Sequence, residues 1–454
     1  MKVLVVDMTH GGLLISSEFM KIPGTEVLAL DIYKSMDPLR IEELKSKGLT
    51  FLESLDDIKE YKNQIVESDL TIVAPVHCKL DYDVTLSHHE AVGYLLNDRI
   101  NIPIIEVTGV KGKTSIVWML KEIFKDSNPL VLSSLGVEVV EEGEWKVLKR
   151  DISITPASII EAWKLSEGYE RGICIFETSL GGTGLADVGI LTNLAEDYSI
   201  ARNSRTASEA KRQIFKSKAV ACEIESYNSK YSEFYGKTNT FGNSTNTKNS
   251  ANLTASQIQF GFDKTNFQID IVDFKTSNQQ ILNESFEVST FAPAPIHITN
   301  VLAAVCASLT LGVSIEKIRE GLNNFKGVKG RTSINEQDGI RIIEEINPGL
   351  NVTSVKKAIS MAKNMDSLGV IFGGKYGVTC EEIDEESVSD VLEGIDEDIP
   401  LILVDKLGAS VKNIIKRNSI YFNDLDDAME TIVDKNLKNV LLIYRSNFSD
   451  LKNR

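Results

Sequence analysis

The sequence is poor in cysteine and lacks a long hydrophobic run. Its five cysteines, among 454 residues, form no closely spaced pair, which argues against a disulfide framework and against a zinc site. The apolar start, 3–6, is interrupted by Asp7 and is too short for a secretion signal. The longest nearly apolar stretch, 301–313, has the length of a buried helix rather than of a membrane span. We therefore expect a cytoplasmic protein.

Basic residues are fewer than acidic residues in this chain. The chain has 49 Lys and Arg against 65 Asp and Glu, for a formal net charge of -16. A protein with this net negative charge does not attract a nucleic acid or an anionic membrane, so neither is expected as a partner. Apolar residues make up 42% of the chain, and 454 residues exceed one ordinary core. The sequence predicts a globular protein of several domains, and it leaves the oligomeric state open.

A glycine-rich turn joins an apolar strand to a helix at residues 107–115, which read Val-Thr-Gly-Val-Lys-Gly-Lys-Thr-Ser. Glycines let the backbone N–H groups of such a turn point inward, toward a bound phosphate, and the N-terminus of the following helix attracts anions. The lysine adds a positive charge, and a hydroxyl group can bind Mg²⁺. The alternative is a strand-to-helix turn with a surface lysine, because only two residues separate the glycines. We expect ATP and Mg²⁺ to bind here, with Lys113 catalytic and Thr114 a metal ligand. The expected nucleotide contacts are Thr108, Gly109, Val110, Lys111, Gly112, Lys113, Thr114 and Ser115.

Carboxylates follow two further predicted strands. The strand 172–176 ends in Glu177, and the strand 188–194 is followed by Asp197. In an open α/β sheet, ligands gather outside the carboxyl ends of the strands. We therefore expect both side chains near the nucleotide's Mg²⁺.

The pattern of strands and helices suggests three domains. Residues 1–101 alternate short β-branched runs with helical stretches, residues 102–329 contain the glycine-rich turn, and residues 330–454 return to βα alternation. The first turn, 8–12, lacks the dinucleotide fingerprint and is not read as an NAD site. Runs at 258–260, 267–271 and 286–288 are predicted to add antiparallel strands to the central sheet. The predicted fold class is α/β, with an N-terminal substrate domain, a central ATP domain and a C-terminal domain.

Four of the five histidines lie in the N-terminal segment. His10 and His77 follow predicted strands, so both should reach the ligand side of the sheet, and histidine is the commonest metal ligand. We regard His10, Gly11, Gly12 and His77 as substrate-side candidates. The alternative is that His77 is only a loop hydrogen-bonder. The adjacent His88 and His89 are expected to cap or decorate a helix.

Together these motifs resemble the Mur ligase superfamily of ATP-dependent ligases. Residues 108–115 are similar to its short phosphate loop, Thr155-Pro156 to its substrate-side pair, and Thr192-Asn193 followed by 196–197 to its strand end and acidic turn. The resemblance implies a Rossmann-like N-terminal domain, a P-loop ATPase central domain and a Rossmann-like C-terminal domain.

The resemblance also implies individual roles. Glu177 would be the Mg²⁺-binding glutamate, and Asn300, within the similar segment 297–304, would border the adenine. Arg331 of the Gly330-Arg331 pair would reach the nucleotide. Lys211, within 210–215, corresponds to a lysine that many members carbamylate to hold a second Mg²⁺.

Two departures from the family pattern are present. Tyr198 stands where members usually have a histidine ligand for the second Mg²⁺, which leaves the number of metal ions open. Asn347-Pro348 or 351–354 could match the family's C-terminal helix opening, but no arginine-bearing motif for an amino-acid substrate follows. The family's usual amine acceptor is therefore expected to be absent.

The N-terminal patterns at 5–12, 30–33 and 87–91 resemble a methanogen branch of the superfamily that closes the last carbocyclic ring of a nickel tetrapyrrole. This resemblance implies a nickel tetrapyrrole acid as the small-molecule substrate, with Lys79 and Arg202 as candidates to pair its carboxylates. Two alternatives stay open: an amide ligase that joins an amino acid to a cell-wall or folate-like acid, and an ATPase of metallocentre assembly that uses the histidines as a cargo site.

Overall fold

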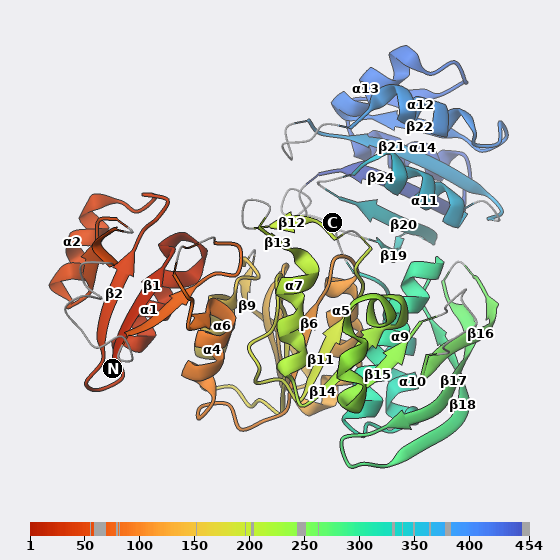
Figure 1. Ribbon diagram of the computed structural model, residues 1–454. Coiled ribbons are helices and arrows are strands. Elements are labelled where there is room, and N and C mark those ends of the chain that lie inside the picture. Colours follow the sequence, from red (N-terminus) through yellow and green to blue (C-terminus); the bar gives the residue numbers. More distant parts are fainter. Residues whose placement is uncertain are drawn as a thin grey trace. The chain divides into compact units, whose positions relative to one another are not determined.

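The computed structural model divides into two compact units. The first contains residues 1–256, 268–287 and 298–321, and the second contains 257–267, 288–297 and 322–454. The described residues are 1–54, 56–58, 70–78, 80, 82–150, 152–195, 197–200, 204–242, 251–261, 263–328, 332–337, 339–347, 350–362, 365–376 and 383–446. Across these ranges, no helix combines the length and apolar character needed to cross a bilayer. Parallel sheets with helices packed on them confirm the predicted α/β class (Figure 1).

The N-terminal sheet has five parallel strands in the order β3-β2-β1-β4-β5. The strands are β1 Lys2–Val6, β2 Glu26–Leu30, β3 Thr50–Leu52, β4 Leu70–Ala74 and β5 Leu86–Ser87, and the helices are η1 Met8–Gly12, α1 Leu13–Phe19, α2 Pro38–Ser46 and α4 His88–Leu96. β2 and β4 lie on opposite sides of β1. The connections beside the carboxyl end of β1 therefore run in opposite directions. Ligands bind at such a switch point in open α/β sheets.

The central sheet has eleven strands in the order β18-β17-β16-β15-β14-β11-β6-β10-β7-β8-β9. Its strands are β6 Ile104–Thr108, β7 Pro129–Ser133, β8 Gly136–Glu141, β9 Glu144–Arg150, β10 Ile173–Glu177, β11 Val188–Leu191, β14 Ala219–Glu223, β15 Thr238–Phe241, β16 Leu253–Gln259, β17 Thr265–Lys275 and β18 Ile281–Thr290. Parallel neighbours β10 and β11 flank β6, which makes β6 a second switch strand. The predicted additional strands lie in β16, β17 and β18, but the pairing of β15 with β16, Phe241 to Leu253, is parallel rather than antiparallel.

Helices and short turns connect these strands. They are α5 Lys113–Ile123, η3 Lys125–Ser127, α6 Pro156–Leu165, α7 Ala207–Lys211, η4 Arg212–Lys216, α8 Ile224–Ser226, η5 Tyr227–Tyr231, η6 Ser232–Lys237, α9 Pro295–Thr310 and α10 Ile315–Asn324, with a small β12 Ser199–Ile200 and β13 Arg205–Thr206 ribbon. The five residues of β6 are all buried, as expected for a central parallel strand. The candidate site residues therefore project from a rigid sheet edge.

The C-terminal sheet has six strands in the order β19-β20-β24-β21-β22-β23, and only β19 is antiparallel to its neighbour among these described strands. Its elements are β19 Thr332–Gln337, β20 Ile340–Ile346, α11 Val352–Ala362, β21 Leu368–Gly374, α12 Glu385–Glu393, β22 Leu401–Val404, α13 Asp405–Ile414, β23 Ile420–Phe422, α14 Leu425–Asp434 and β24 Asn439–Arg445. Separate apolar cores cover its two faces. Asn351 accepts a hydrogen bond from the Ser354 amide at 3.0 Å and so opens α11, as the sequence indicated.

A buried carboxylate ties α1 to α6. Glu18 has no solvent-exposed side-chain surface and forms ion pairs with Lys21 at 2.7 Å, with Arg99 at 2.8 Å and with Lys164 of α6. Burial alone would raise the pKa of Glu18, but hydrogen bonds from Lys164, Lys21 and Arg99 lower it to about 2. The cluster holds the N-terminal sheet against α6, whose first residues border the candidate site.

Replacing Glu18 with Gln should destabilise the protein by about 2 kcal/mol at pH 7, since it leaves three cations without their anion. The folded-state pKa of Glu18 lies below its unfolded value, so the stabilisation is present above about pH 4.3 and is lost as the pH falls toward 2. Urea unfolding of wild type and variant at several pH values measures this difference.

Glu43→Gln is the matched control, because Glu43 also pairs with two cations, Arg40 and Lys47, but is exposed. It should leave the unfolding midpoint unchanged. Equal stability of wild type and Glu18→Gln at pH 7 would contradict the anchoring role.

Candidate active site

The phosphate loop occupies the turn between β6 and α5. Gly109 and Gly112 have φ of 142° and 89°, in the left-handed region that glycine tolerates. A Cβ on Gly109 would lie 1.9 Å from Thr192 Oγ1, and a Cβ on Gly112 would lie 2.3 Å from Asn300 Oδ1. Both glycines are therefore required by close contacts as well as by backbone conformation. Asn300 of α9, which is buried, lies directly against the loop.

Thr192 and Asn193, at the end of β11, hold this loop in shape. The Thr192 hydroxyl donates to the Lys111 carbonyl at 2.6 Å, and the side-chain Nδ2 of Asn193 donates to the same oxygen at 3.0 Å. The Val110 amide in turn donates to the Asn193 carbonyl at 3.1 Å. The loop is thus preformed by its neighbouring strand, with Lys113 Nζ folded back to 3.1 Å from the Gly109 carbonyl.

Oxygen atoms converge beside the start of α5. The Thr114 hydroxyl donates to Glu177 Oε1 at 3.1 Å, and the Ser134 amide donates to Glu177 Oε2 at 3.1 Å. The Ser134 hydroxyl lies 3.3 Å from that of Thr114. Carboxylate and hydroxyl oxygens are the ligands that Mg²⁺ prefers, so this set fits the ion. The sequence analysis missed Ser134, which follows β7 and was detectable by the same strand-end reasoning that selected Glu177.

Lys211 is completely buried and so does not lie on a helix surface. A capping box between Thr206 and Glu209 starts α7 and so fixes the position of Lys211. Its Nζ donates to the Ser179 carbonyl at 2.7 Å. Burial, and then the charge of Lys113, lower the pKa of Lys211 to about 7.

The acidic turn after β11 contributes to α7. Asp197 accepts hydrogen bonds from the Ser208 amide at 2.9 Å and the Ser208 hydroxyl at 2.7 Å, and it lies 3.5 Å from Lys230 Nζ. These contacts connect Asp197 to α7 and its surroundings rather than to Thr114 and Glu177. Tyr198 is partly exposed, and its ring centroid lies 5.8 Å from Lys211 Nζ. The expected residues Lys79, Glu196, Arg202 and Arg331 lie outside the described residues.

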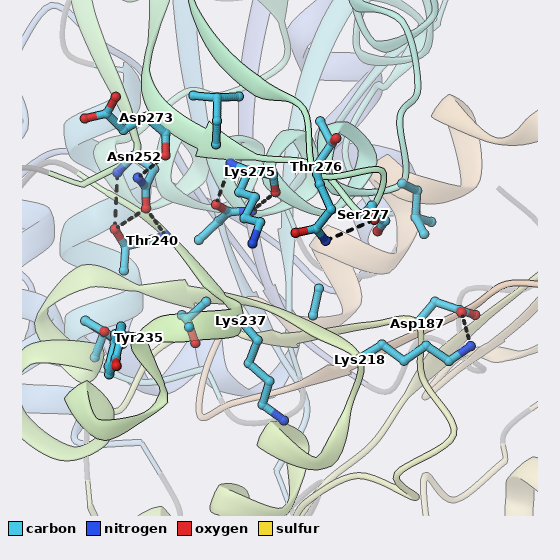
Figure 2. Close-up of a pocket in the computed structure, with 18 of the residues that line it drawn as sticks. Asp187, Lys218, Tyr235, Lys237, Thr240, Asn252, Asp273, Lys275, Thr276 and Ser277 are labelled. Carbon is cyan, nitrogen blue, oxygen red and sulfur yellow. Dashed lines mark hydrogen bonds and ion pairs between the residues drawn. The ribbon is translucent and has the colours of Figure 1, made fainter.

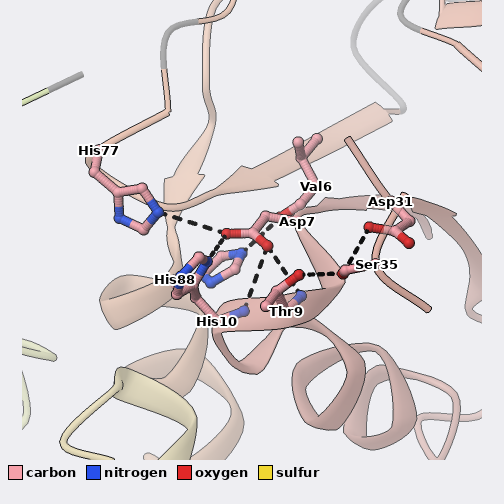
Figure 3. A network of polar contacts seen from close by, with 8 residues as sticks. All are labelled: Val6, Asp7, Thr9, His10, Asp31, Ser35, His77 and His88. Atoms are coloured by element: carbon pink, nitrogen blue, oxygen red, sulfur yellow. Dashed lines mark hydrogen bonds and ion pairs between the residues drawn. The ribbon is translucent and has the colours of Figure 1, made fainter. Parts of the chain in front are cut away.

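A second cluster forms at the switch point of the N-terminal sheet (Figure 3). Asp7 directly follows β1, is fully buried and has a positive φ of 70°, which is strained for a residue with a side chain. Its Oδ1 accepts from the Thr9 amide at 2.9 Å, while Oδ2 lies 2.7 Å from His10 Nδ1 and 3.5 Å from His77 Nε2. The rings of His10 and His77 are 4.9 Å apart and nearly perpendicular. The structure thus brings the two candidate histidines together around a carboxylate that the sequence analysis missed.

The Asp7 carboxylate is charged despite its burial. Burial would raise the pKa of Asp7, but the two neighbouring imidazoles and the Thr9 amide lower it to about 2. Because an ionised carboxylate only accepts hydrogen bonds, His10 carries its proton on Nδ1.

His88 and His89 are buried in the first turn of α4, whereas the sequence suggested a surface position. A ring nitrogen of His88, Nε2, lies 2.9 Å from the Val6 carbonyl. His89 is 2% exposed, and neither of its ring nitrogens has a hydrogen-bond partner among the described residues. Burial lowers the pKa of His88 to about 4 and that of His89 to about 3, and the charge of Lys211 contributes to the shift of His89. Both rings are therefore neutral.

A cavity of about 370 Å³ borders the histidine cluster. Its lining residues are His10, Pro75, Val76, His77, His88, His89, Ser153, Ile154, Thr155, Pro156, Ser179 and Leu180. It thus extends from the histidine cluster to Ser179, whose carbonyl accepts the hydrogen bond from Lys211 Nζ. Gly11 and Gly12 are not among these lining residues: a Cβ on Gly11 would lie 2.5 Å from Ala157 Cβ of α6, and one on Gly12 would lie 2.1 Å from the Asp7 carbonyl. Both glycines shape the turn that presents His10.

A larger cavity of about 860 Å³ lies elsewhere (Figure 2). It is lined by Pro103, Asp187, Ala219 and Thr238, which stand at the amino ends of β6, β11, β14 and β15. Asp187 is occupied by a structural role, because it accepts from the Ile104 amide at 2.8 Å and pairs with Lys218 at 2.8 Å. Because ligands of parallel sheets bind at the carboxyl ends, volume alone does not identify the active site.

Known proteins share this architecture. MurF from Acinetobacter baumannii superimposes with a TM-score of 0.59 at 16% identity, over 86% of each chain. MurF from Thermotoga maritima in complex with ADP gives 0.54 at 13% identity, over 95% of each chain. Two proteins named coenzyme F(430) synthetase are each 29% identical: that of Methanosarcina acetivorans over 94% of each chain, and that of Methanocaldococcus jannaschii over 93% of this chain and 95% of its own. A model of the family described as coenzyme F430 synthetase CfbE, C-terminal domain, matches residues 334–447.

The chain is similar over nearly its whole length to proteins named coenzyme F(430) synthetase, and it has the fold of the Mur ligases. It is an enzyme of the ATP-dependent ligase class, and the predicted Mur-ligase-like α/β fold is confirmed. The structure divides into two compact units, and the three predicted domain ranges stay predictions. The roles of its individual site residues remain predictions.

In this ligase, Gly112→Ala should abolish binding of Mg²⁺-ADP, because the new Cβ collides with Asn300 Oδ1 and displaces the phosphate loop. Gly24→Ala is a matched control, since Gly24 also has a positive φ, of 74°, but no atom within 4 Å of the added Cβ. Each change should cost roughly 1 kcal/mol of stability through backbone strain. Gly112→Ala should lose more than this because of its collision with Asn300. Titration calorimetry should show ADP binding for Gly24→Ala only, and wild-type affinity in Gly112→Ala would contradict the loop assignment.

Proposed function

We propose that this ligase uses ATP to activate a carboxylate of a nickel tetrapyrrole and then closes a carbocyclic ring within the same molecule. The observation that carries the proposal is the cavity that leads from the histidine cluster to Ser179, beneath Lys211. The relatives named coenzyme F(430) synthetase, which match nearly the whole chain, support this substrate class. So does the absence, noted in the sequence, of an amino-acid motif after 351–354.

On the nucleotide side, backbone N–H groups of 108–115 cradle the phosphates, and Lys113 neutralises the transferring phosphoryl group. Thr114 and Glu177 hold Mg²⁺, and Asn300 borders the adenine. The bound nucleotide supplies the phosphoryl group that converts a carboxylate into an activated acyl group. Arg331 is proposed to reach the nucleotide as well.

In the first step, a carboxylate oxygen of the substrate bonds to the γ-phosphorus, and the bond to ADP breaks. In the second, a ring carbon of the same substrate bonds to the acyl carbon, and phosphate departs with the electron pair of the broken C–O bond. The proton lost from the ring carbon passes to the departing phosphate. Lys211 is buried, and its pKa is lowered by burial and by the charge of Lys113; as its carbamate it would hold a second Mg²⁺ that neutralises the transferring group.

The substrate side rests on the N-terminal cluster. His10 and His77, presented by the turn at Gly11 and Gly12, lie at one end of the cavity, and the apolar side chains of Val76, Ile154 and Leu180 can pack against a macrocycle. A volume of about 370 Å³ is within the range of ligand pockets and would enclose one edge of such a molecule.

The decisive assay combines purified protein, ATP, Mg²⁺ and the nickel seco-acid precursor without any amine. Mass spectrometry should find a product lighter by one water, and ADP should form stoichiometrically. Lys113→Ala should fold normally but produce neither, because the phosphoryl transfer loses its cation. Coupling of an added amino acid would indicate an amide ligase instead, and ATP hydrolysis without a ligated product would indicate an ATPase of metallocentre assembly.

A separate prediction is that Lys211 acts as its carbamate, which supplies an oxygen ligand for a second Mg²⁺. Only the neutral amine adds CO₂, and a pKa of about 7 makes that form accessible near neutrality, so reactivation of CO₂-depleted enzyme should accelerate as the pH rises through 7. Lys211→Ala should lose activity and regain part of it with short carboxylic acids. Lys218→Ala, at the opposite sheet edge, should behave as wild type. Full activity of Lys211→Ala would contradict the prediction.

A further inference from the structure

The Asp7, His10 and His77 cluster has no part in the phosphoryl transfer described above. One ligand atom from each residue lies within 4.8 Å of the others, a spacing that can surround a metal ion. The carboxylate is buried and strained, while the His10 side chain is 47% exposed and lines the cavity. Such strain persists where the surrounding structure enforces it, and it concentrates at functional sites.

We propose that His10 ligates the nickel of the macrocyclic substrate through Nε2, with Asp7 and His77 as positioning residues. The inference rests on the proposed function and specifies how the substrate is held. Asp7 accepts the Nδ1 proton of His10 at 2.7 Å, which leaves the Nε2 lone pair directed away from the carboxylate. Metal-bound histidines commonly donate their other ring N–H to a carboxylate, which fixes the ring and raises its basicity.

The neighbours of His10 favour the same arrangement. His77 packs edge-on against the His10 ring at 4.9 Å and limits its rotation (Figure 3). Imidazole is a suitable ligand for nickel(II), and the four in-plane nitrogens of a tetrapyrrole leave the axial positions open. A protein nitrogen projecting into the cavity can therefore complete the coordination without displacing the macrocycle.

His89 gives an independent indication that the cavity receives a polar ligand. It is buried, lines the cavity and has two ring nitrogens without hydrogen-bond partners among the residues described. Leaving such atoms unpaired is costly, so a ligand group that pairs with them gains binding energy. The bond to nickel would hold the centre of the substrate at His10, and the side chains of the substrate would extend past His89 toward Ser179 and Lys211.

The test measures X-ray absorption of the nickel seco-acid bound to the full chain without ATP. In the wild type, the nickel shell should gain an imidazole nitrogen. His10→Ala should lose that nitrogen and weaken binding roughly tenfold or more, and Asp7→Asn should weaken binding by a similar factor. Adding free imidazole to His10→Gly should restore the axial ligand, which a merely structural role of His10 would not produce.

Lys113→Ala separates this inference from the proposed function. It should bind the seco-acid with the same imidazole signature although it cannot convert it. Ring closure by the wild type with no imidazole on nickel would overturn the axial-ligand proposal and leave the function intact, whereas failure to bind or convert the seco-acid would overturn both. Nickel(II) ions alone are the second probe: binding that requires His10, with an unchanged nickel shell in the seco-acid, would assign the cluster to a free metal ion and also overturn the proposal.

Discussion

The carboxyl ends of parallel strands are the constraint on which the rest of the site depends. β1 lies between β2 and β4, and β6 lies between β11 and β10. The connections at the carboxyl ends of β1 and β6 therefore run to opposite sides, which leaves a crevice at each end. Asp7 and the phosphate loop begin at these two ends, and Glu177, Thr192 and His77 follow adjacent strands. Buried strands are rigid, so the polar groups keep their positions before any ligand arrives. That preorganisation is what charge-stabilising catalysis requires.

The candidate site contains positive charge, although the chain as a whole is negatively charged. The protein has a net charge of -16, yet the region beside the cavity contains the interacting cations Lys113 and Lys211. Burial of Lys211 costs free energy unless an anion offsets it, and the Ser179 carbonyl offers only a dipole. Carbamylation would remove this buried positive charge and turn Lys211 into an oxygen ligand for Mg²⁺. The lowered pKa of Lys211 thus favours the neutral amine that adds CO₂.

The sequence was sufficient for features that depend on local order. The phosphate loop, Glu177 and the strand-end histidines follow from short patterns and from one rule about parallel sheets. Features that depend on distant contacts were missed: His88 meets the Val6 carbonyl across 82 positions, and the need for Gly112 comes from Asn300. Ser134 and Asp7 obey the strand-end rule but have no distinctive pattern around them. The antiparallel hairpin of β8 and β9 was likewise not anticipated, although its two-residue turn contains Gly143 at a positive φ of 81°.

A tetrapyrrole acid presents several carboxylates of similar chemistry, and a lysine-rich site attracts each of them. Discrimination must therefore come from geometry, since the charge of the reacting group is the same in every orientation. A bond from His10 to nickel fixes the centre of the macrocycle but leaves rotation about that bond free. A second contact is needed to select one side chain of the substrate, and His89 lines the same cavity as His10 with two ring nitrogens that have no hydrogen-bond partner among the described residues. In the proposed arrangement the two histidines would have complementary roles, because His10 would set the distance of the macrocycle and His89 would set its rotation.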